Sequence, residues 1–158
     1  MKRLILLRHA KAEADSPGGD FERPLSARGR KDALRMGEEI RRLGLNFDLV
    51  LASPARRVAE TVEALGELVP RFDPRLYNAS TGQLLNLVRE IEDHVGSLLL
   101  VGHNPGIELL AARLAASERI GDYPTGALAE TELTIDQWRE AGKASGRLIR
   151  FISPKDLA

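Results

Sequence analysis

The sequence contains no cysteine, which excludes a disulfide framework, a thiolate zinc site and a cysteine nucleophile. It has no run of about 20 apolar residues, the length needed to cross a bilayer, and the apolar run near its start is too short for a signal peptide. Lys plus Arg number 23, as do Asp plus Glu, so there is no basic excess for nucleic acid or a membrane surface. We therefore expect a cytoplasmic protein that binds neither nucleic acid nor membrane.

The length of 158 residues is typical of one domain and is sufficient for a continuous core. No internal repeat, low-complexity tract or interdomain linker interrupts it. We expect a single domain over residues 1–158, present as a monomer.

Short apolar runs alternate with helical patterns along the chain. Ser26 is expected to cap a helix that stops at Gly44, and a capping box of Ser80 and Gln83 predicts another. Strands are expected at 4–7, 48–52 and 97–101, a weaker one at 72–76, an edge-type strand with one wet face at 129–135, and a closing strand at 148–152, whereas 118–126 is expected to be irregular. This alternation is typical of a three-layer α/β/α sandwich with a mainly parallel central sheet.

Two strands are followed at once by a polar residue and a proline, Ser53-Pro54 and Asn104-Pro105. Each pair predicts an N-cap and a first helical residue, with the first helix reaching Val69. Helix N-termini present free N–H groups and a partial positive charge, which favour an anion.

Charged and titratable residues stand where the apolar strands end. Arg8 and His9 follow the first strand, Arg57 lies just beyond the second, and His103 follows the third. In open α/β sheets the carboxyl ends of the strands form the ligand site. Phosphate suits such a cluster, because guanidinium groups match its oxygens bidentately. One imidazole can be neutral and nucleophilic while another is protonated and donates a hydrogen bond.

Purely structural roles could also explain these residues. His94 lies near the polar end of a helix and is interpreted as solvated, while Ser53 and Asn104 are sufficiently explained as helix caps. Arg56 and Arg57 could form a solvated helix turn with nearby glutamates. The convergence on one sheet edge favours the functional interpretation.

Six stretches carry a resemblance to a known family. They are Leu6–Glu13, Arg23–Ser26 with Gly29, Ser53–Thr61, Gly102–Gly106, Pro124–Ala127 and Phe151–Leu157. Together they resemble the histidine phosphatase superfamily, with its phosphoglycerate-mutase-like fold, and in particular its small SixA-type phosphohistidine phosphatases. The family's spacing of serine, arginine and threonine selects Arg57 over Arg56.

The resemblance implies a mechanism in which His9 attacks phosphorus and water then hydrolyses the phosphohistidine. Arg8, Arg57 and His103 would hold the transferring oxygens, and no metal or other cofactor is expected. The candidate substrate-binding residues are Asn104 (through its backbone N–H), Arg23 and Lys11.

One departure from the family bears on the substrate. Larger members place a glutamate after the third strand to protonate an alcohol, whereas the matching residues Leu76–Ala79 contain no carboxylate. Loss of a general acid slows ester cleavage by roughly 10²–10⁴-fold. Cleavage of a phosphorus–nitrogen bond is slowed less, because a protonated imidazole leaves easily. The chain also lacks long lid insertions, and an open cleft suits phosphohistidine on a partner protein.

Alternatives remain open. The loop 11–24 is a candidate binding element that could close on substrate, and its carboxylates could replace the missing acid: Glu13, Asp15, Asp20 and Glu22. The leading hypothesis is a metal-independent phosphohistidine phosphatase that acts on a protein or phosphoramidate substrate. A small-molecule phosphomonoesterase or mutase of the same fold is the second hypothesis. A non-catalytic module that binds a phosphorylated partner is the third. An acyl hydrolase is disfavoured, because Asn104 stands where a nucleophile elbow requires serine.

Overall fold

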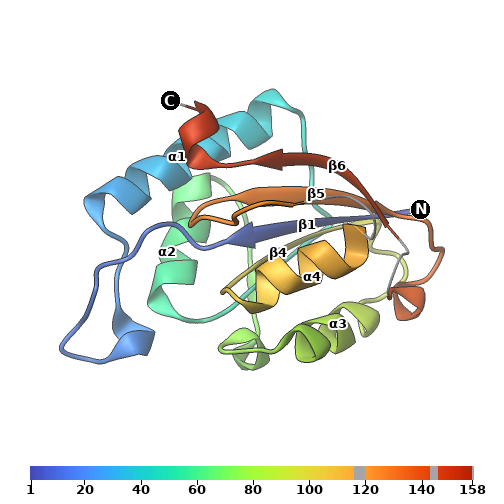
Figure 1. Ribbon diagram of the computed structural model, residues 1–158, viewed down its shortest axis with the longest axis horizontal. Coiled ribbons are helices and arrows are strands. Elements are labelled where there is room, and N and C mark those ends of the chain that lie inside the picture. The colour runs from blue at the N-terminus through green and yellow to red at the C-terminus, as the bar shows by residue number, and fades with distance from the viewer. Residues whose placement is uncertain (116–119, 143–145, 158) are drawn as a thin grey trace.

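A computed structural model describes residues 1–115, 120–142 and 146–157 and contains a six-stranded sheet, ordered β3-β2-β4-β1-β5-β6 (Figure 1). The strands are β1 (Lys2–Arg8), β2 (Leu49–Ala52), β3 (Arg71–Phe72), β4 (Ser97–Gly102), β5 (Leu128–Leu133) and β6 (Gly146–Ile152). The pairs β3–β2, β2–β4 and β4–β1 are parallel, whereas the pairs β1–β5 and β5–β6 are antiparallel. The prediction of a mainly parallel sheet is confirmed.

Helices cover both faces of this sheet (Figure 1). They are α1 (Ala27–Arg42), α2 (Arg56–Leu65), α3 (Thr81–Arg89) and α4 (Gly106–Ala115). Alternate residues of a strand point to opposite faces, and in β1 Leu4 and Leu6 join the core under α3 and α4. Ile5 and Leu7 join the core under α1 and α2. The chain therefore forms the predicted three-layer α/β/α sandwich.

Several helix caps follow the sequence prediction. The Ser26 hydroxyl accepts a hydrogen bond from the Gly29 N–H at 3.0 Å. Ser80 and Gln83 form the reciprocal capping box, and Gly44 ends the first helical region with a φ of 69°.

The two helices beside the sheet edge begin later than predicted. The first of them, α2, has Ala55 as its N-cap residue, so Ser53 is not a cap. Its last residue is Leu65, which leaves Val69 outside the helix and 91% exposed. The other, α4, begins at Gly106 rather than at the preceding proline. Ser53 bonds instead to His103, whereas the Asn104 side chain still accepts from the Glu108 N–H in the first turn of α4.

A strand, β5, lies where 129–135 predicted one, but the prediction that it is an edge-type strand with one wet face is wrong. β5 lies between β1 and β6 and is buried almost throughout. Its polar residue Glu130 is 1% exposed and forms ion pairs with Arg3 at 3.1 Å and Arg150 at 2.7 Å. A buried charge requires such partners, so the alternating pattern here reflects paired charges rather than a wet face.

Two smaller predictions have different outcomes. The weak strand is only two residues long, because Pro74 begins a 3₁₀ turn through Leu76 and cannot donate a ladder hydrogen bond. Of the segment 118–126, residues 118–119 lie outside the described residues, and 120–126 are irregular as expected. Among the described residues, no helix is long and apolar enough to span a membrane.

Candidate active site

The carboxyl ends of β1 and β4 and the start of α2 bring three side chains into contact. Arg57 Nε lies 3.3 Å from His9 Nε2, and Arg57 Nη2 lies 3.2 Å from His103 Nδ1. The two imidazole rings are 5.4 Å apart. Residues that are distant in sequence therefore surround one buried position at the end of the sheet.

The backbone around His9 is held on several sides. Its N–H donates to the Gly102 carbonyl at 3.0 Å, and its carbonyl accepts from the Gly126 N–H at 2.9 Å. The next N–H, of Ala10, donates to the Thr61 hydroxyl at 3.0 Å. The imidazole thus extends from a fixed main chain.

Hydrogen bonds assign the tautomer of His9. Its Nδ1 lies 2.7 Å from the Ala10 carbonyl, which can only accept, so Nδ1 carries the proton. Nε2 then keeps its lone pair and faces the guanidinium of Arg57. Burial lowers the pKa of His9 to about 3, outweighing the Ala10 hydrogen bond, and the charges around it act in the same direction as burial. At neutral pH the ring is neutral, and its Nε2 lone pair accepts a hydrogen bond from Arg57 Nε.

His103 has the opposite tautomer. Its Nδ1 accepts from Arg57, and its Nε2 donates to the Ser53 hydroxyl at 2.8 Å. Burial, and next the charge of Arg57, lower the pKa of His103 to about 4. The sequence suggested one neutral and one protonated imidazole, whereas here both pKa values are lowered. The negative charge of a phosphoryl group beside His103 would raise its pKa and favour the protonated donor.

Arg57 also contacts the loop 11–24. Its Nη1 donates to the Asp20 carbonyl at 2.8 Å, and its Nη2 lies 3.2 Å from the Asp20 carboxylate. The Tyr77 hydroxyl donates to the same carboxylate. That bond, followed by those from Arg23 and Arg57, lowers the pKa of Asp20 to about 2. Of the four loop carboxylates considered as acids, this is the one that reaches Arg57 in the described structure, and it is ionised at neutral pH.

Arg8 is the last residue of β1 and directly precedes His9. Its Nη1 donates to the Tyr123 carbonyl at 2.9 Å, whereas its buried Nε has no hydrogen-bond partner in the described structure. Burial lowers its pKa, and Glu108 acts in the opposite direction. Its positive charge helps to lower the pKa of both His9 and His103. A guanidinium with a free buried donor is suited to an anion.

The three candidate substrate-binding residues have three different environments. Arg23 is at the rim, with Nε 3.0 Å from the Asp20 carboxylate and Nη1 2.7 Å from the Glu13 carbonyl. The Asn104 side chain bonds to the Tyr123 carbonyl at 3.1 Å and accepts from the Glu108 N–H at 3.2 Å, which supports the start of α4. Lys11 is exposed, and the structure brings its side chain to none of these groups.

Two residues contribute more than the sequence indicated. Ser53 was interpreted as a helix cap but orients His103. Tyr77 belongs to the stretch that the sequence marked only as lacking a carboxylate. Its hydroxyl bonds to Asp20, and its ring lies 5.5 Å from the His103 ring. The serine–arginine–threonine spacing was a usable signal for Ser53, whereas no sequence pattern marks Tyr77.

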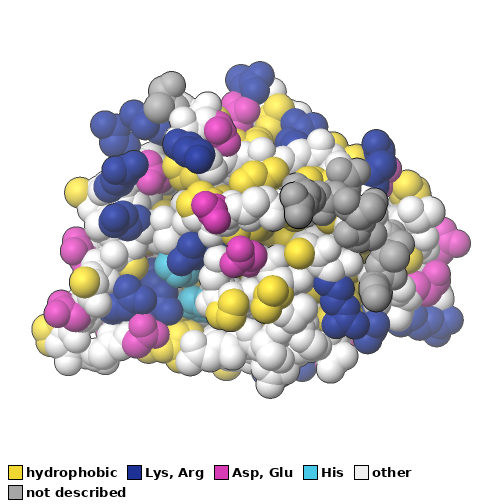
Figure 2. Space-filling view, viewed as in Figure 1, with side chains coloured by type: hydrophobic (Ala, Val, Ile, Leu, Met, Phe, Trp, Pro, Cys, Tyr) yellow, Lys and Arg dark blue, Asp and Glu magenta, His cyan; other side chains and the backbone are white. Residues whose placement is uncertain are grey.

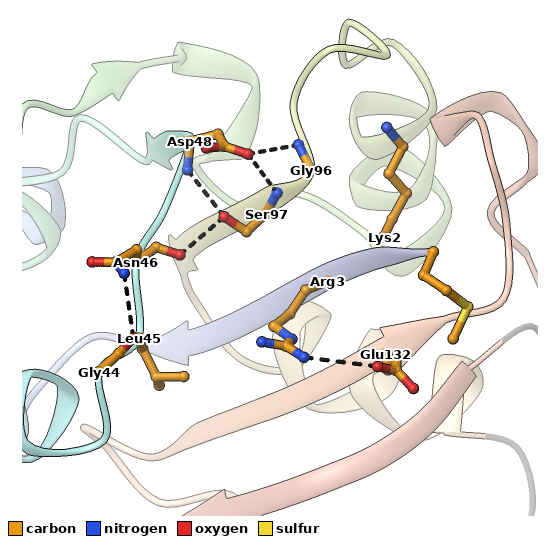
Figure 3. Close-up of a pocket in the computed structure, with 10 residues that line it drawn as sticks. Lys2, Arg3, Gly44, Leu45, Asn46, Asp48, Gly96, Ser97 and Glu132 are labelled. Carbon is orange, nitrogen blue, oxygen red and sulfur yellow. Dashed lines mark hydrogen bonds and ion pairs between the residues drawn. The ribbon is translucent and has the colours of Figure 1, made fainter.

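A hollow of about 310 Å³ lies at the opposite end of the strands (Figure 3). Its polar groups bond to one another: the Asp48 carboxylate accepts from the N–H groups of Gly96 at 2.7 Å and Ser97 at 3.1 Å. Of its two basic side chains, Arg3 pairs with Glu132 at 3.7 Å and Lys2 donates to the Val95 carbonyl at 3.0 Å. The hollow contains no histidine, so the histidine–arginine cluster is the candidate active site.

The fold and this cluster define a histidine phosphatase. The family profile of the histidine phosphatase superfamily (branch 1) matches residues 4–101, and the chain belongs to that family. The protein Rv1276c of Mycobacterium tuberculosis, described as uncharacterized, is 31% identical over 94% of this chain and 100% of its own. Phosphohistidine phosphatase SixA of Escherichia coli is 27% identical over 85% of this chain and 86% of its own. The structure of a candidate SixA phosphohistidine phosphatase from Nakamurella multipartitia has a TM-score of 0.88 at 26% identity, covering 97% of this chain and 96% of that one.

Proposed function

We propose that this phosphatase removes phosphoryl groups from phosphohistidine on a protein, through a phosphohistidine formed on His9. The observation that carries the proposal is the neutral Nε2 of His9, directed at Arg57 while Nδ1–H donates to the Ala10 carbonyl. The substrate class is also supported by the resemblance of the whole chain to SixA proteins.

In the first step His9 Nε2 forms a bond to phosphorus as the phosphorus–nitrogen bond of the substrate breaks. The bonding pair stays on the substrate nitrogen. If the distal nitrogen of that imidazole carries a proton, the ring leaves as neutral imidazole. The proton on His9 Nδ1 stays hydrogen-bonded to the Ala10 carbonyl and stabilises the positive phosphorylated ring.

In the second step water attacks phosphorus and the bond to His9 breaks, which regenerates the neutral imidazole and releases phosphate. Arg57 and Arg8 supply fixed positive charge for the equatorial oxygens. His103, protonated by proximity to phosphate, donates a further hydrogen bond. These groups provide the charge neutralisation, and we propose that the reaction is metal-independent.

The groups near the pocket mouth favour a nitrogen leaving group. Asp20 is ionised and therefore a poor proton donor to an alkoxide. Its hydrogen bond from Tyr77 raises the pKa of that phenol, which makes Tyr77 a weaker acid as well. An imidazole needs no such donor, because it can take up its proton on the distal nitrogen before cleavage.

The test compares wild-type protein with His9→Asn. A phosphohistidine protein, a sugar phosphate and phosphoglycerate are assayed in parallel, with and without EDTA. We expect preferred hydrolysis of phosphohistidine, EDTA resistance, and an acid-labile phosphoenzyme that His9→Asn does not form. Turnover retained by His9→Asn would remove His9 as nucleophile, and clear preference for the esters would support the phosphomonoesterase instead.

A further inference from the structure

A second positively charged feature lies between α1 and the 3₁₀ turn Pro154–Leu157, called here the C-terminal turn. It is a groove of about 510 Å³. It is lined by Ala27, Arg28, Lys31, Asp32, Arg35, Pro154 and Lys155. This cationic groove contains four basic side chains and one carboxylate, although the whole chain has no net charge.

The single carboxylate in the groove does not neutralise it. Asp32 lies 3.9 Å from Arg28, the longest of the ion-pair contacts on α1, and its own side chain is only 12% exposed. Lys31 and Arg35 form no ion pair with any described residue. The Asp156 carboxylate beside Lys155 is already held by the N–H and hydroxyl of Ser153, at 2.8 and 3.0 Å. Most of the positive charge of the groove is therefore available to a partner.

The cationic groove adjoins the active-site edge on both sides. Gly126, whose N–H donates to the carbonyls of Arg8 and His9, packs against Pro154, since a Cβ placed there would lie 2.9 Å from the proline ring. On α1, Gly29 packs against the main chain of Lys11, two residues beyond the proposed nucleophile. Figure 2 shows Lys and Arg side chains gathered over α1 and the C-terminal turn, on a face where histidine side chains are also visible.

We propose that the cationic groove binds an acidic segment of the phosphorylated protein substrate and so delivers its phosphohistidine to His9. This inference rests on the proposed function, because it places the rest of the substrate outside the phosphoryl pocket. Flexible, solvated Lys and Arg side chains suit an acidic polypeptide surface, and charge complementarity of this kind mainly accelerates association. The groove thus contributes substrate selection, while the pocket performs the reaction.

The probes are two synthetic peptides of equal length, each with one phosphohistidine, flanked by six aspartates or by six serines. The double variant K31E/R35E reverses two charges of the groove and is the test variant, and R113E is the matched control. Arg113 is exposed on α4, which covers the other face of the sheet, and forms no ion pair with a described residue. We expect K31E/R35E to lower kcat/KM for the aspartate peptide by about 10-fold or more, leaving the serine peptide unchanged. R113E should change neither value.

Salt provides a second measurement. With wild-type protein, kcat/KM for the aspartate peptide should fall steeply between 50 and 500 mM NaCl, and with K31E/R35E it should not. Thermal unfolding of both variants checks their folding. If K31E/R35E does not fold, K155E replaces it with the same expected loss.

Equal kcat/KM values for the two peptides, or an equal loss with R113E, would overturn the groove inference and leave the proposed function intact. A single-stranded oligonucleotide that binds the groove as tightly as the aspartate peptide would also overturn it. Binding of the aspartate peptide without its phosphate, measured by fluorescence anisotropy, separates the two proposals. If that binding is lost in K31E/R35E while wild-type protein hydrolyses no phosphohistidine, the groove inference stands and the proposed function fails.

Discussion

Arg57 makes more contacts with the proposed reaction centre than any other described side chain. One guanidinium bonds to both imidazoles and to the carbonyl and carboxylate of Asp20. Its neighbour Arg56 lies on the outside of α2 and pairs with Glu60 at 3.0 Å. Adjacent arginines therefore have entirely different environments.

This difference gives a matched pair of variants. Arg57→Ala should lower kcat by about 10³-fold or more, as loss of an arginine that neutralises a transferring phosphoryl group does. Arg56→Ala should leave kcat within about twofold, since an exposed ion pair contributes little. Steady-state kinetics on a small phosphoramidate measures both. Comparable losses in the two variants would show that the reaction does not depend on the buried guanidinium.

Asp20 competes with a bound oxyanion for Arg57, because its carboxylate lies 3.2 Å from Nη2. Asp20→Asn should tighten competitive inhibition by inorganic phosphate or tungstate by about 2- to 5-fold, the range of an exposed ion pair. Glu22→Gln, in the same loop but without an ion pair in the described structure, is the control. Weaker inhibition in Asp20→Asn would indicate instead that Asp20 mainly positions the arginine.

At the scale of elements, α1 and α2 approach closely where α1 carries a glycine. A Cβ at Gly37 would lie 2.1 Å from the Leu65 carbonyl oxygen of α2, which no real contact allows. Gly82 in α3 has nothing within 4 Å of such an atom. The close packing of α1 on α2 therefore requires glycine at position 37, whereas position 82 in α3 has room for a side chain.

Gly37→Ala should destabilise the protein by about 1–3 kcal/mol through overpacking, although alanine is the better helix former. Gly82→Ala should be neutral or stabilising by up to about 1 kcal/mol. Urea unfolding of the two variants against wild type measures the difference. Equal stability of both variants would mean that α1 and α2 can separate without cost.

The helices and strands were largely predictable because their patterns are local. Apolar runs buried on both faces marked β1 and β4, and capping residues marked α1 and α3. β5 was misinterpreted because burial of Glu130 depends on two arginines far away in the sequence. Hydrophobic periodicity reports burial and carries no information about such partners.

The same distinction applies to the site. Strand ends placed His9 and His103 at one edge, because the carboxyl ends of parallel strands meet there. The contact of Asp20 with Tyr77 spans 57 positions and links the short 3₁₀ turn Asp20–Glu22 to the residue that follows the 3₁₀ turn Pro74–Leu76. Neither element has a periodic signal, so only the folded chain reveals the contact.

For the whole molecule, the buried imidazoles link folding to pH. The pKa values of His9 and His103 are lowered to about 3 and about 4, below the ordinary value of 6.5. Above pH 6.5 both rings are neutral in folded and unfolded chains. As the pH falls towards 4, the unfolded chain binds protons that the folded protein does not, and stability is lost.

Each ring should contribute a slope of up to about 1.4 kcal/mol per pH unit over that window. Urea unfolding between pH 7 and pH 4.5 measures the total slope. His9→Asn should show a shallower decline than wild type, because one of the two groups is absent. Identical slopes in variant and wild type would mean that the ring of His9 gains its proton as readily in the fold as in the open chain.

The position of β4 between β1 and β2 has a consequence for biosynthesis. These two strands do not pair with each other, so a nascent chain that lacks β4 joins the histidine and the arginine only outside the sheet, through the packing of α1 on α2 and the Ala10–Thr61 hydrogen bond. Insertion of residues 97–102 joins these two strands in one sheet and brings His103 with it. The pair of buried imidazoles is therefore complete only when the central strand is in place.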